Sequence, residues 1–314
     1  MNARTAALAL AAIIIVSVSL TERSGADAPA PAYGGGASLQ KVPAAFSSQP
    51  ANLSADVPRV ARNLSRNWDA LDPEVNAAAA LVYSLDDRET LLGVRTYGRW
   101  PMASLTKLFT AIVAAETIGY QNLVVLTESA IATEGNGVAF SPGEEFSARD
   151  LSRAMVIASS NDAAAAFEEY VGGRAEFLKR ARAVAEQAGM SQTVIVDAAG
   201  LSSENESSAS DILKLLQRIA ATHPEIFEWT RRTSFLFQPA NDPASRTASN
   251  ANPFASDARF LGGKTGTLPE ARENFAGIFL LDGRRIAVVV LGSYDRVREV
   301  NELLDWTARA YQFD

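Results

Sequence analysis

Two apolar segments near the C-terminus restrict the fold more than any other feature of the chain. NFAGIFLL and RRIAVVVLGS are rich in β-branched and aromatic residues, and only Asp282-Gly283 separates them. Asp-Gly favours the two-residue turn of a β-hairpin, so the two segments predict a pair of antiparallel strands. We expect a third strand just before this hairpin, around Lys264, and a final helix over residues 296–311.

Two further strands are expected earlier in the chain, with helices alone between the two groups. AAAALVYSL and ETLLGV have the pattern of short strands joined by a turn at Asp86-Asp87. Capping residues and terminal glycines then mark helices over residues 104–116, 148–158, 161–171, 174–188 and 209–222. This order predicts an α+β fold, in which an antiparallel β-sheet is flanked by helices and an all-helical subdomain is inserted in the middle.

The N-terminal residues differ in composition from the rest of the chain. Arg4 precedes an uncharged apolar run over residues 5–20, and sequence rich in Ala, Pro, Gly and Ser follows. Such a start is typical of an export signal, and the run is also close to the length of a membrane span. We expect residues 1–28 to be a signal peptide or an N-terminal membrane anchor, residues 29–74 a linker and residues 75–314 the folded domain. The protein is therefore expected in the periplasm or at the outer face of the cytoplasmic membrane.

A few residue counts exclude several kinds of chemistry. The 314 residues include no Cys and one His, His223, and the net charge is −7. Without Cys there is no thiol nucleophile, disulfide or Cys-ligated metal, and one His cannot form a multi-histidine metal site. The acidic balance argues against nucleic acid as a partner. An enzyme of this composition must work mainly with Ser, Thr, Lys, Asp, Glu and backbone amides.

Three short motifs carry the residue types of a serine hydrolase. Ser104-Leu105-Thr106-Lys107 places a hydroxyl and an amine one helical turn apart, at a predicted helix start. Ser159-Ser160-Asn161 falls in a loop between two predicted helices, and Lys264-Thr265-Gly266-Thr267 falls on a predicted strand. Each motif alone has an ordinary explanation: a helical turn, a helix cap or a charged edge strand. Together and in this order, they form the signature of penicillin-binding proteins and β-lactamases.

The sequence around these motifs resembles the D-alanyl-D-alanine carboxypeptidase family, the low-molecular-mass penicillin-binding proteins that are S11-type serine peptidases. The resemblance extends over residues 76–293 and includes WPMASLTKLFTA, TEGNGVAFSPGEEFSARDL, IASSNDAAAA, DAAGL and LGGKTGT. It implies a β-lactamase/transpeptidase-like fold, with residues 75–314 as a penicillin-binding D,D-peptidase domain. SNANPFAS before the third motif and PEARENFAG after it depart from the family's usual form, so the resemblance carries over to the nucleophile and not to substrate preference.

The resemblance also implies the catalytic roles. Ser104 would attack the carbonyl between the two terminal D-alanines of a peptidoglycan stem peptide, with Lys107 as general base. Ser159 would relay a proton to the leaving amine, and Lys264 would tune that hydroxyl electrostatically. Asn161 would hold the substrate amide and Lys107. No metal or organic cofactor is required by this scheme.

Substrate binding is expected to involve the third motif. Thr265 would bind the terminal carboxylate, and Gly266 lets another backbone approach the strand closely. The backbone N–H groups of Ser104 and Thr267 would form the oxyanion hole. The expected partners are peptidoglycan stem peptides, β-lactam antibiotics as covalent inhibitors, and a membrane if residues 1–28 are retained.

Three other functions stay open at this point. A D,D-endopeptidase that cleaves peptidoglycan cross-links would use the same catalytic groups. A class A β-lactamase would carry Glu-x-x-x-Asn between the second and third motifs, whereas the pair Glu270 and Asn274 lies after the third. An inert wall-binding module could keep the fold, although three intact motifs argue against it.

Overall fold

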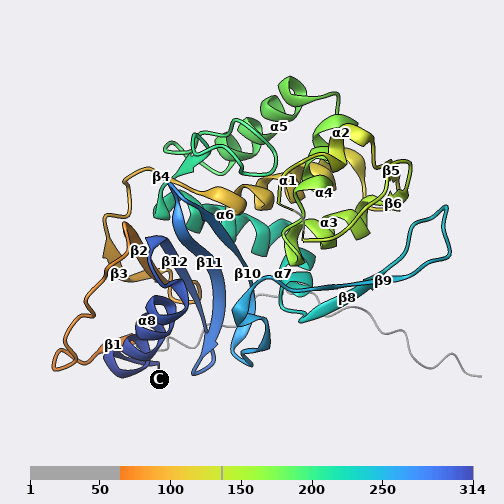
Figure 1. The fold of residues 1–314 in the computed structure, drawn as a ribbon. Coiled ribbons are helices and arrows are strands. Elements are labelled where there is room, and N and C mark those ends of the chain that lie inside the picture. The colour runs from red at the N-terminus through yellow and green to blue at the C-terminus, as the bar shows by residue number, and fades with distance from the viewer. Residues whose placement is uncertain (1–63, 136, 314) are drawn as a thin grey trace, which may run out of the picture. The chain divides into compact units, whose positions relative to one another are not determined.

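The computed structural model describes residues 64–135 and 137–313 (Figure 1). The predicted export segment, 1–28, and most of the predicted linker, 29–74, lie outside these residues. Within the described part of the chain, no helix is long and apolar enough to cross a membrane.

An antiparallel sheet of five strands forms the base of the domain, in the order β10-β11-β12-β2-β3. Its strands are β2 (Ala79–Ser84), β3 (Glu89–Val94), β10 (Phe260–Leu268), β11 (Arg272–Leu281) and β12 (Arg284–Ser293). All five were expected from the sequence. The β11–β12 turn has positive φ at both Asp282 (48°) and Gly283 (77°), as a tight hairpin turn of this twist requires.

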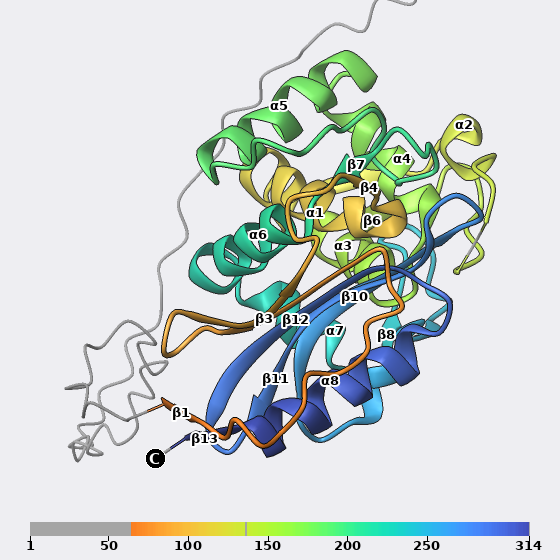
Figure 2. The ribbon, with the colours of Figure 1, turned by 90° about the vertical axis from the view of Figure 1, so that its left-hand side faces the viewer.

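The central strand β12 is buried on both faces, which explains its nearly continuous apolar sequence. Val288 and Val290 belong to one core with α8 (Arg296–Ala310), whereas Val289 and Leu291 belong to the other core. The second core includes the apolar face of α6 (Ala209–Thr222), and Figure 2 shows α6 and α8 on opposite faces of the sheet. The two-residue period of a strand produces this separation.

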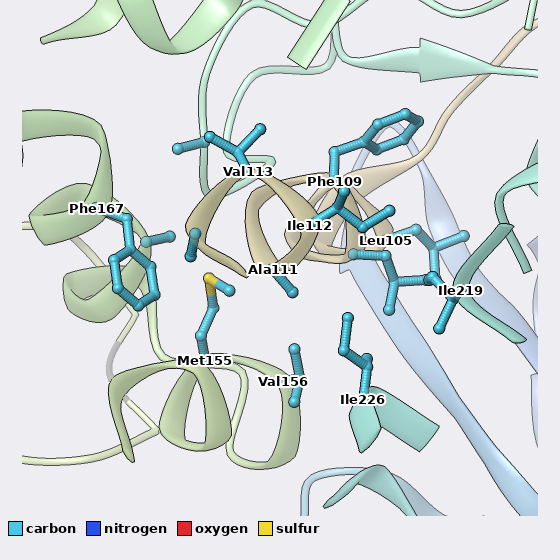
Figure 3. Packing of buried hydrophobic residues seen from close by; sticks show 14 of the residues in the cluster. Leu105, Phe109, Ala111, Ile112, Val113, Met155, Val156, Phe167, Ile219 and Ile226 are labelled. Carbon is cyan, nitrogen blue, oxygen red and sulfur yellow. The ribbon is translucent and has the colours of Figure 1, made fainter. Parts of the chain in front are cut away.

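The helical subdomain is built around a helix that is buried on every side. α1 (Lys107–Val113) follows a 3₁₀ turn, η1 (Ala103–Thr106), and continues into a π-helical turn, η2 (Ala114–Ile118). Figure 3 shows how residues of η1 and α1 pack against Met155, Phe167 and Ile219 of neighbouring helices. Such complete burial makes α1 a rigid support for the residues at its N-terminal end. The other helices of the subdomain are α2 (Glu128–Ile131), α3 (Ala148–Ile157), α4 (Asn161–Tyr170), α5 (Arg174–Gln187), α6 and α7 (Glu225–Thr230).

Several short elements were not predicted, because they contain too few residues for a periodic pattern. They are the ribbons β4 (Trp100–Pro101) with β7 (Glu206–Ser207), β5 (Leu123–Val125) with β6 (Glu145–Ser147), and β8 (Ser234–Phe237) with β9 (Arg246–Ser249), and the 3₁₀ turn η3 (Pro253–Ser256).

The ribbon of β1 (Leu64–Arg66) with β13 (Tyr311–Phe313) changes the expected boundary of the domain. β1 lies inside the predicted linker, 29–74, yet it pairs with the last strand, and the Asn67 N–H donates to Ala310 O at 2.8 Å. Residues from 64 onward are therefore part of the folded domain. Pairing between the two ends of a domain is a long-range contact, which local composition does not reveal.

Candidate active site

The first motif lies where η1 passes into α1. Ser104 is in the 3₁₀ turn, and Lys107 is the first residue of α1, so the α-helix begins three residues later than predicted. Lys107 Nζ lies 3.1 Å from Ser104 Oγ. The turn is close against Gly200, where an added Cβ would collide with the carbonyl of Ala103. The expected contact between hydroxyl and amine is thus present.

The amine of Lys107 is fully buried and is held by oxygen acceptors. Besides Ser104 Oγ, it donates to Asn161 Oδ1 at 2.7 Å and to Ala199 O at 2.5 Å. Burial lowers the pKa of Lys107 to about 7, while the negative charge of Asp197 acts in the opposite direction. A large fraction of this amine is consequently neutral near neutral pH, and a neutral amine can accept a proton.

The second motif connects α3 to α4, and its three residues have separate tasks. Ser160 caps α4 by accepting a hydrogen bond from Ala163 N at 3.2 Å, as the capping explanation predicts for this residue. Ser159 has a φ of 59°, and its hydroxyl points to the third motif. Asn161 Nδ2 donates to Gly135 O at 2.9 Å and to Glu134 O. These bonds orient the amide so that its oxygen faces Lys107.

The third motif lies on β10, an edge strand of the sheet next to α7 (Figure 1). Lys264 Nζ donates to Ser159 Oγ at 2.9 Å and to Thr265 O at 2.8 Å. Burial lowers the pKa of Lys264 well below its usual value, and the positive charges of Lys107 and Arg296 lower it further. The site therefore contains two lysine–serine pairs, Lys107–Ser104 and Lys264–Ser159.

Gly266 allows the motif strand to lie directly against the nucleophile segment. A Cβ at this position would come within 2.8 Å of Met102 O and 3.1 Å of Ser104 N. Any larger residue would push β10 away from Ser104, so the sequence expectation of close backbone approach is realised here. Thr265 beside it is buried, whereas Thr267 is exposed at the end of the motif.

Sequence reasoning missed Arg296, the first residue of α8. Its guanidinium donates to Gly266 O at 2.8 Å and to Thr267 Oγ1 at 2.9 Å, so it adds a cation to the third motif. Burial lowers the pKa of Arg296. It stands 29 residues beyond Thr267 and belongs to no motif, and only the packing of α8 on the sheet brings it to the site.

A second missed residue, Asp197, shapes the loop that faces Lys107. Its carboxylate accepts four backbone N–H bonds from residues 199–202 and one from Asn205 Nδ2. This arrangement directs Ala199 O towards the amine of Lys107. Asn205 O in turn accepts the N–H of Met102, two residues before the nucleophile. The segment DAAGL, residues 197–201, is part of the family resemblance, but its sequence alone assigned no role to the carboxylate of Asp197.

The remaining chemistry of the described residues lies elsewhere. His223 ends α6 and lies between Glu116 and Glu225. In residues 64–135 and 137–313, no cluster of three or more His, Asp or Glu side chains could hold a metal ion. The contact between Ser104 and the buried Lys107 supports nucleophilic attack by the serine hydroxyl, with the lysine amine to accept its proton.

Comparison with known proteins agrees with this geometry. The family model of D-alanyl-D-alanine carboxypeptidases (peptidase S11) matches residues 67–295. D-alanyl-D-alanine carboxypeptidase DacB2 of Mycobacterium tuberculosis is 28% identical over 77% of this chain and 82% of its own length. A D-alanyl-D-alanine endopeptidase of Haemophilus influenzae is 33% identical over 44% of this chain and 49% of its own. Against carboxypeptidases DacC and DacD of Escherichia coli and DacF of Bacillus subtilis, the match covers 63% of the relative's length.

Among solved structures, penicillin-binding protein D2 of Listeria monocytogenes in its cefotaxime-bound form has a TM-score of 0.66 and 26% identity. The match covers 75% of this chain and 98% of that one. The expected α+β fold and enzyme class are thereby confirmed. The chain belongs to the D-alanyl-D-alanine carboxypeptidase family, peptidase S11.

Proposed function

We propose that the protein is a penicillin-sensitive serine D-Ala-D-Ala carboxypeptidase that trims peptidoglycan stem peptides through an acyl-enzyme on Ser104. One observation carries the proposal most directly: the buried amine of Lys107, with a pKa of about 7, lies 3.1 Å from Ser104 Oγ. This pair supplies a nucleophile and a base without histidine.

In the proposed acylation step, Ser104 Oγ attacks the carbonyl carbon of the penultimate D-alanine while Lys107 Nζ takes the hydroxyl proton. The carbonyl oxygen becomes negative and would accept hydrogen bonds from the N–H groups of Ser104 and Thr267. The close packing of Gly266 against Ser104 supports this placement. In comparable sites each such donor contributes roughly 3 kcal/mol to the transition state.

Collapse of this intermediate breaks the peptide bond and releases D-alanine. The leaving nitrogen needs a proton, and the Ser159 hydroxyl, which accepts a hydrogen bond from Lys264 Nζ at 2.9 Å, would relay to it the proton that Lys107 took from Ser104. Asn161 would hold the substrate amide, while Thr265 would bind the terminal carboxylate with Arg296 as a nearby cation. Water then hydrolyses the ester on Ser104 and regenerates the enzyme.

β-Lactams would act as covalent inhibitors of the same serine. Their ring carbonyl and carboxylate resemble the two groups of D-Ala-D-Ala that the site would recognise. The similarity to the cefotaxime-bound penicillin-binding protein of Listeria supports this expectation. Because its substrate would be peptidoglycan, the protein would act outside the cytoplasm. Whether it works in the periplasm or at the outer face of the cytoplasmic membrane depends on residues 1–28, which lie outside the described residues.

The pKa of Lys107 gives a pH prediction. Only the neutral amine accepts a proton, so protonation below a pKa of about 7 removes the base. We expect the rate of acylation by a fluorescent penicillin to rise about tenfold per pH unit up to that pKa and then level off. Stopped-flow fluorescence across the neutral range measures it. A rate that stays constant through neutral pH would contradict the assignment of Lys107 as base.

The second candidate function is that of a D,D-endopeptidase, and similarity to three such enzymes favours it. Three endopeptidases, from Haemophilus influenzae, Pseudomonas aeruginosa and Escherichia coli, are 30–33% identical to this chain over about half its length. Digestion of purified muropeptides with mass analysis separates the two activities. We expect D-alanine release from pentapeptides. If cross-linked dimers were cleaved and the pentapeptides stayed intact, the endopeptidase would be favoured instead.

A further inference from the structure

Asn274 on β11 carries a fully buried side-chain amide that has no part in the steps proposed above. Its Nδ2 donates to Pro101 O at 2.8 Å, and its Oδ1 accepts the N–H of Gly292 at 2.8 Å. Pro101 stands three residues before Ser104, and Gly292 is on β12, the middle strand of the sheet. One side chain therefore ties the segment that leads into the nucleophile to the centre of the sheet.

The two backbone groups that contact this amide have opposite polarity. Pro101 O needs a donor, whereas the Gly292 N–H needs an acceptor. Gly292 has a φ of 71° and lies where the β11–β12 register shifts between Glu273 and Phe275, so its N–H is free to bond to a side chain. A carboxylate would supply acceptors alone, and an aliphatic side chain would supply neither group. The two contacts together thus require an amide at position 274.

Asn274 is also the cross-strand neighbour of the glycine that touches the nucleophile segment. It pairs with Gly266 across the β10–β11 ladder. A Cβ added to Gly266 would lie only 2.8 Å from Met102 O and 3.1 Å from Ser104 N, and η1 contacts both strands of the pair. The segment from Pro101 to Ser104 therefore lies against one cross-strand pair, Gly266 with Asn274.

The packing at this pair determines the geometry of the proposed oxyanion hole. The two N–H groups assigned to the hole belong to Ser104, on the nucleophile segment, and to Thr267, next to Gly266 on β10. Their spacing depends on how closely the segment is held against the strand. Gly266 permits the close approach but offers no side chain to maintain it, whereas Asn274 bonds directly to Pro101 O.

We propose that Asn274 is a positioning residue that sets the separation between the N–H groups of Ser104 and Thr267. The inference rests on the proposed function and names a residue on which its rate depends. Asn274 acts through the nucleophile segment and contacts neither substrate nor reacting atoms. A residue that affects only the fit to the transition state should change kcat and leave KM nearly the same.

The test uses two substitutions in the full chain. Asn274→Asp keeps an acceptor for the Gly292 N–H and loses the donor to Pro101 O, while Asn274→Ala removes both contacts and leaves room for water. Trp100 Nε1 donates to Ala271 O at 2.9 Å and holds the same segment, so we expect a small displacement and a retained fold. In both variants, kcat for D-alanine release from a peptide ending in D-Ala-D-Ala should fall about 10- to 100-fold, with KM within about threefold of the wild type.

Val288→Ala is the matched control for loss of stability. Val288 is buried on β12 in the core that includes α8, so its truncation leaves a cavity without touching the nucleophile segment. It should unfold at a lower temperature than the wild type and keep the wild-type kcat. In every variant, kcat is expressed per active site, counted from the endpoint of labelling by fluorescent penicillin, so that unfolded protein does not lower it.

A wild-type kcat per site in Asn274→Asp would overturn the positioning role, and so would a loss that appears in KM alone. An equal fall in kcat in Val288→Ala would overturn it as well, because reduced stability would then explain the effect. The wild type reports on the proposed function separately. If it neither bound penicillin nor released D-alanine, the proposed function would be overturned, and the role of Asn274 with it.

Discussion

Replacing Ser104 with Ala is expected to lower D-alanine release at least about 10⁴-fold and to abolish acylation by penicillin. Without Ser104 Oγ the proposed mechanism has no covalent step. The groups that only bind substrate would accelerate the reaction little. Ser159 Oγ is the other hydroxyl close to a buried lysine, but it donates towards the leaving amine in this scheme. Kinetic release of D-alanine from a pentapeptide and gel detection of fluorescent penicillin measure the two effects.

The fold should survive this change, because within the described residues the hydrogen bond of the Ser104 side chain is with Lys107. Circular dichroism and thermal unfolding should therefore match the wild type closely. Ser159→Ala serves as the comparison: it should slow turnover yet still form some penicillin adduct. Labelling of Ser104→Ala at the wild-type level would refute the assignment of the nucleophile.

The second large effect is expected from Lys107→Met, which keeps much of the side-chain volume and removes the base. We expect acylation to slow about 10³-fold, because general-base catalysis contributes that order of magnitude. The change also leaves Asn161 Oδ1 and Ala199 O without their donor, which costs about 1–3 kcal/mol of stability for each oxygen. Rates should therefore be measured on protein that thermal unfolding shows to be folded.

Lys179→Met provides the control, since Lys179 is exposed on α5 and belongs to none of the three motifs. Its acylation rate should equal that of the wild type. If Lys107→Met kept a rate within tenfold of the wild type, another group would have to accept the proton from Ser104.

The elements that the sequence predicted well depend on local chemistry. The Asp282-Gly283 turn needs only two residues with positive φ. Ser147 and Ser208 cap α3 and α6 by accepting bonds from N–H groups three residues later. The three motifs could be placed for the same reason, because one lies at the start of a predicted helix, one in the loop between two predicted helices and one on a predicted strand.

The features that sequence reasoning missed depend on contacts between distant segments. Arg296 reaches Gly266 only because α8 packs on the sheet. Asp197 matters through the loop geometry that it imposes on Ala199 O, and β1 forms only by pairing with β13. A single sequence contains no periodic or capping signal for such contacts. The roles of the individual site residues likewise stay predictions until variants are measured.

The most direct measurement is the position of the acyl group on the wild-type protein. The enzyme would be trapped with a penicillin, digested, and its peptides sequenced by mass spectrometry. We expect one adduct, on the peptide that contains Ser104. An adduct on Ser159 or on another residue, or none at all, would contradict it.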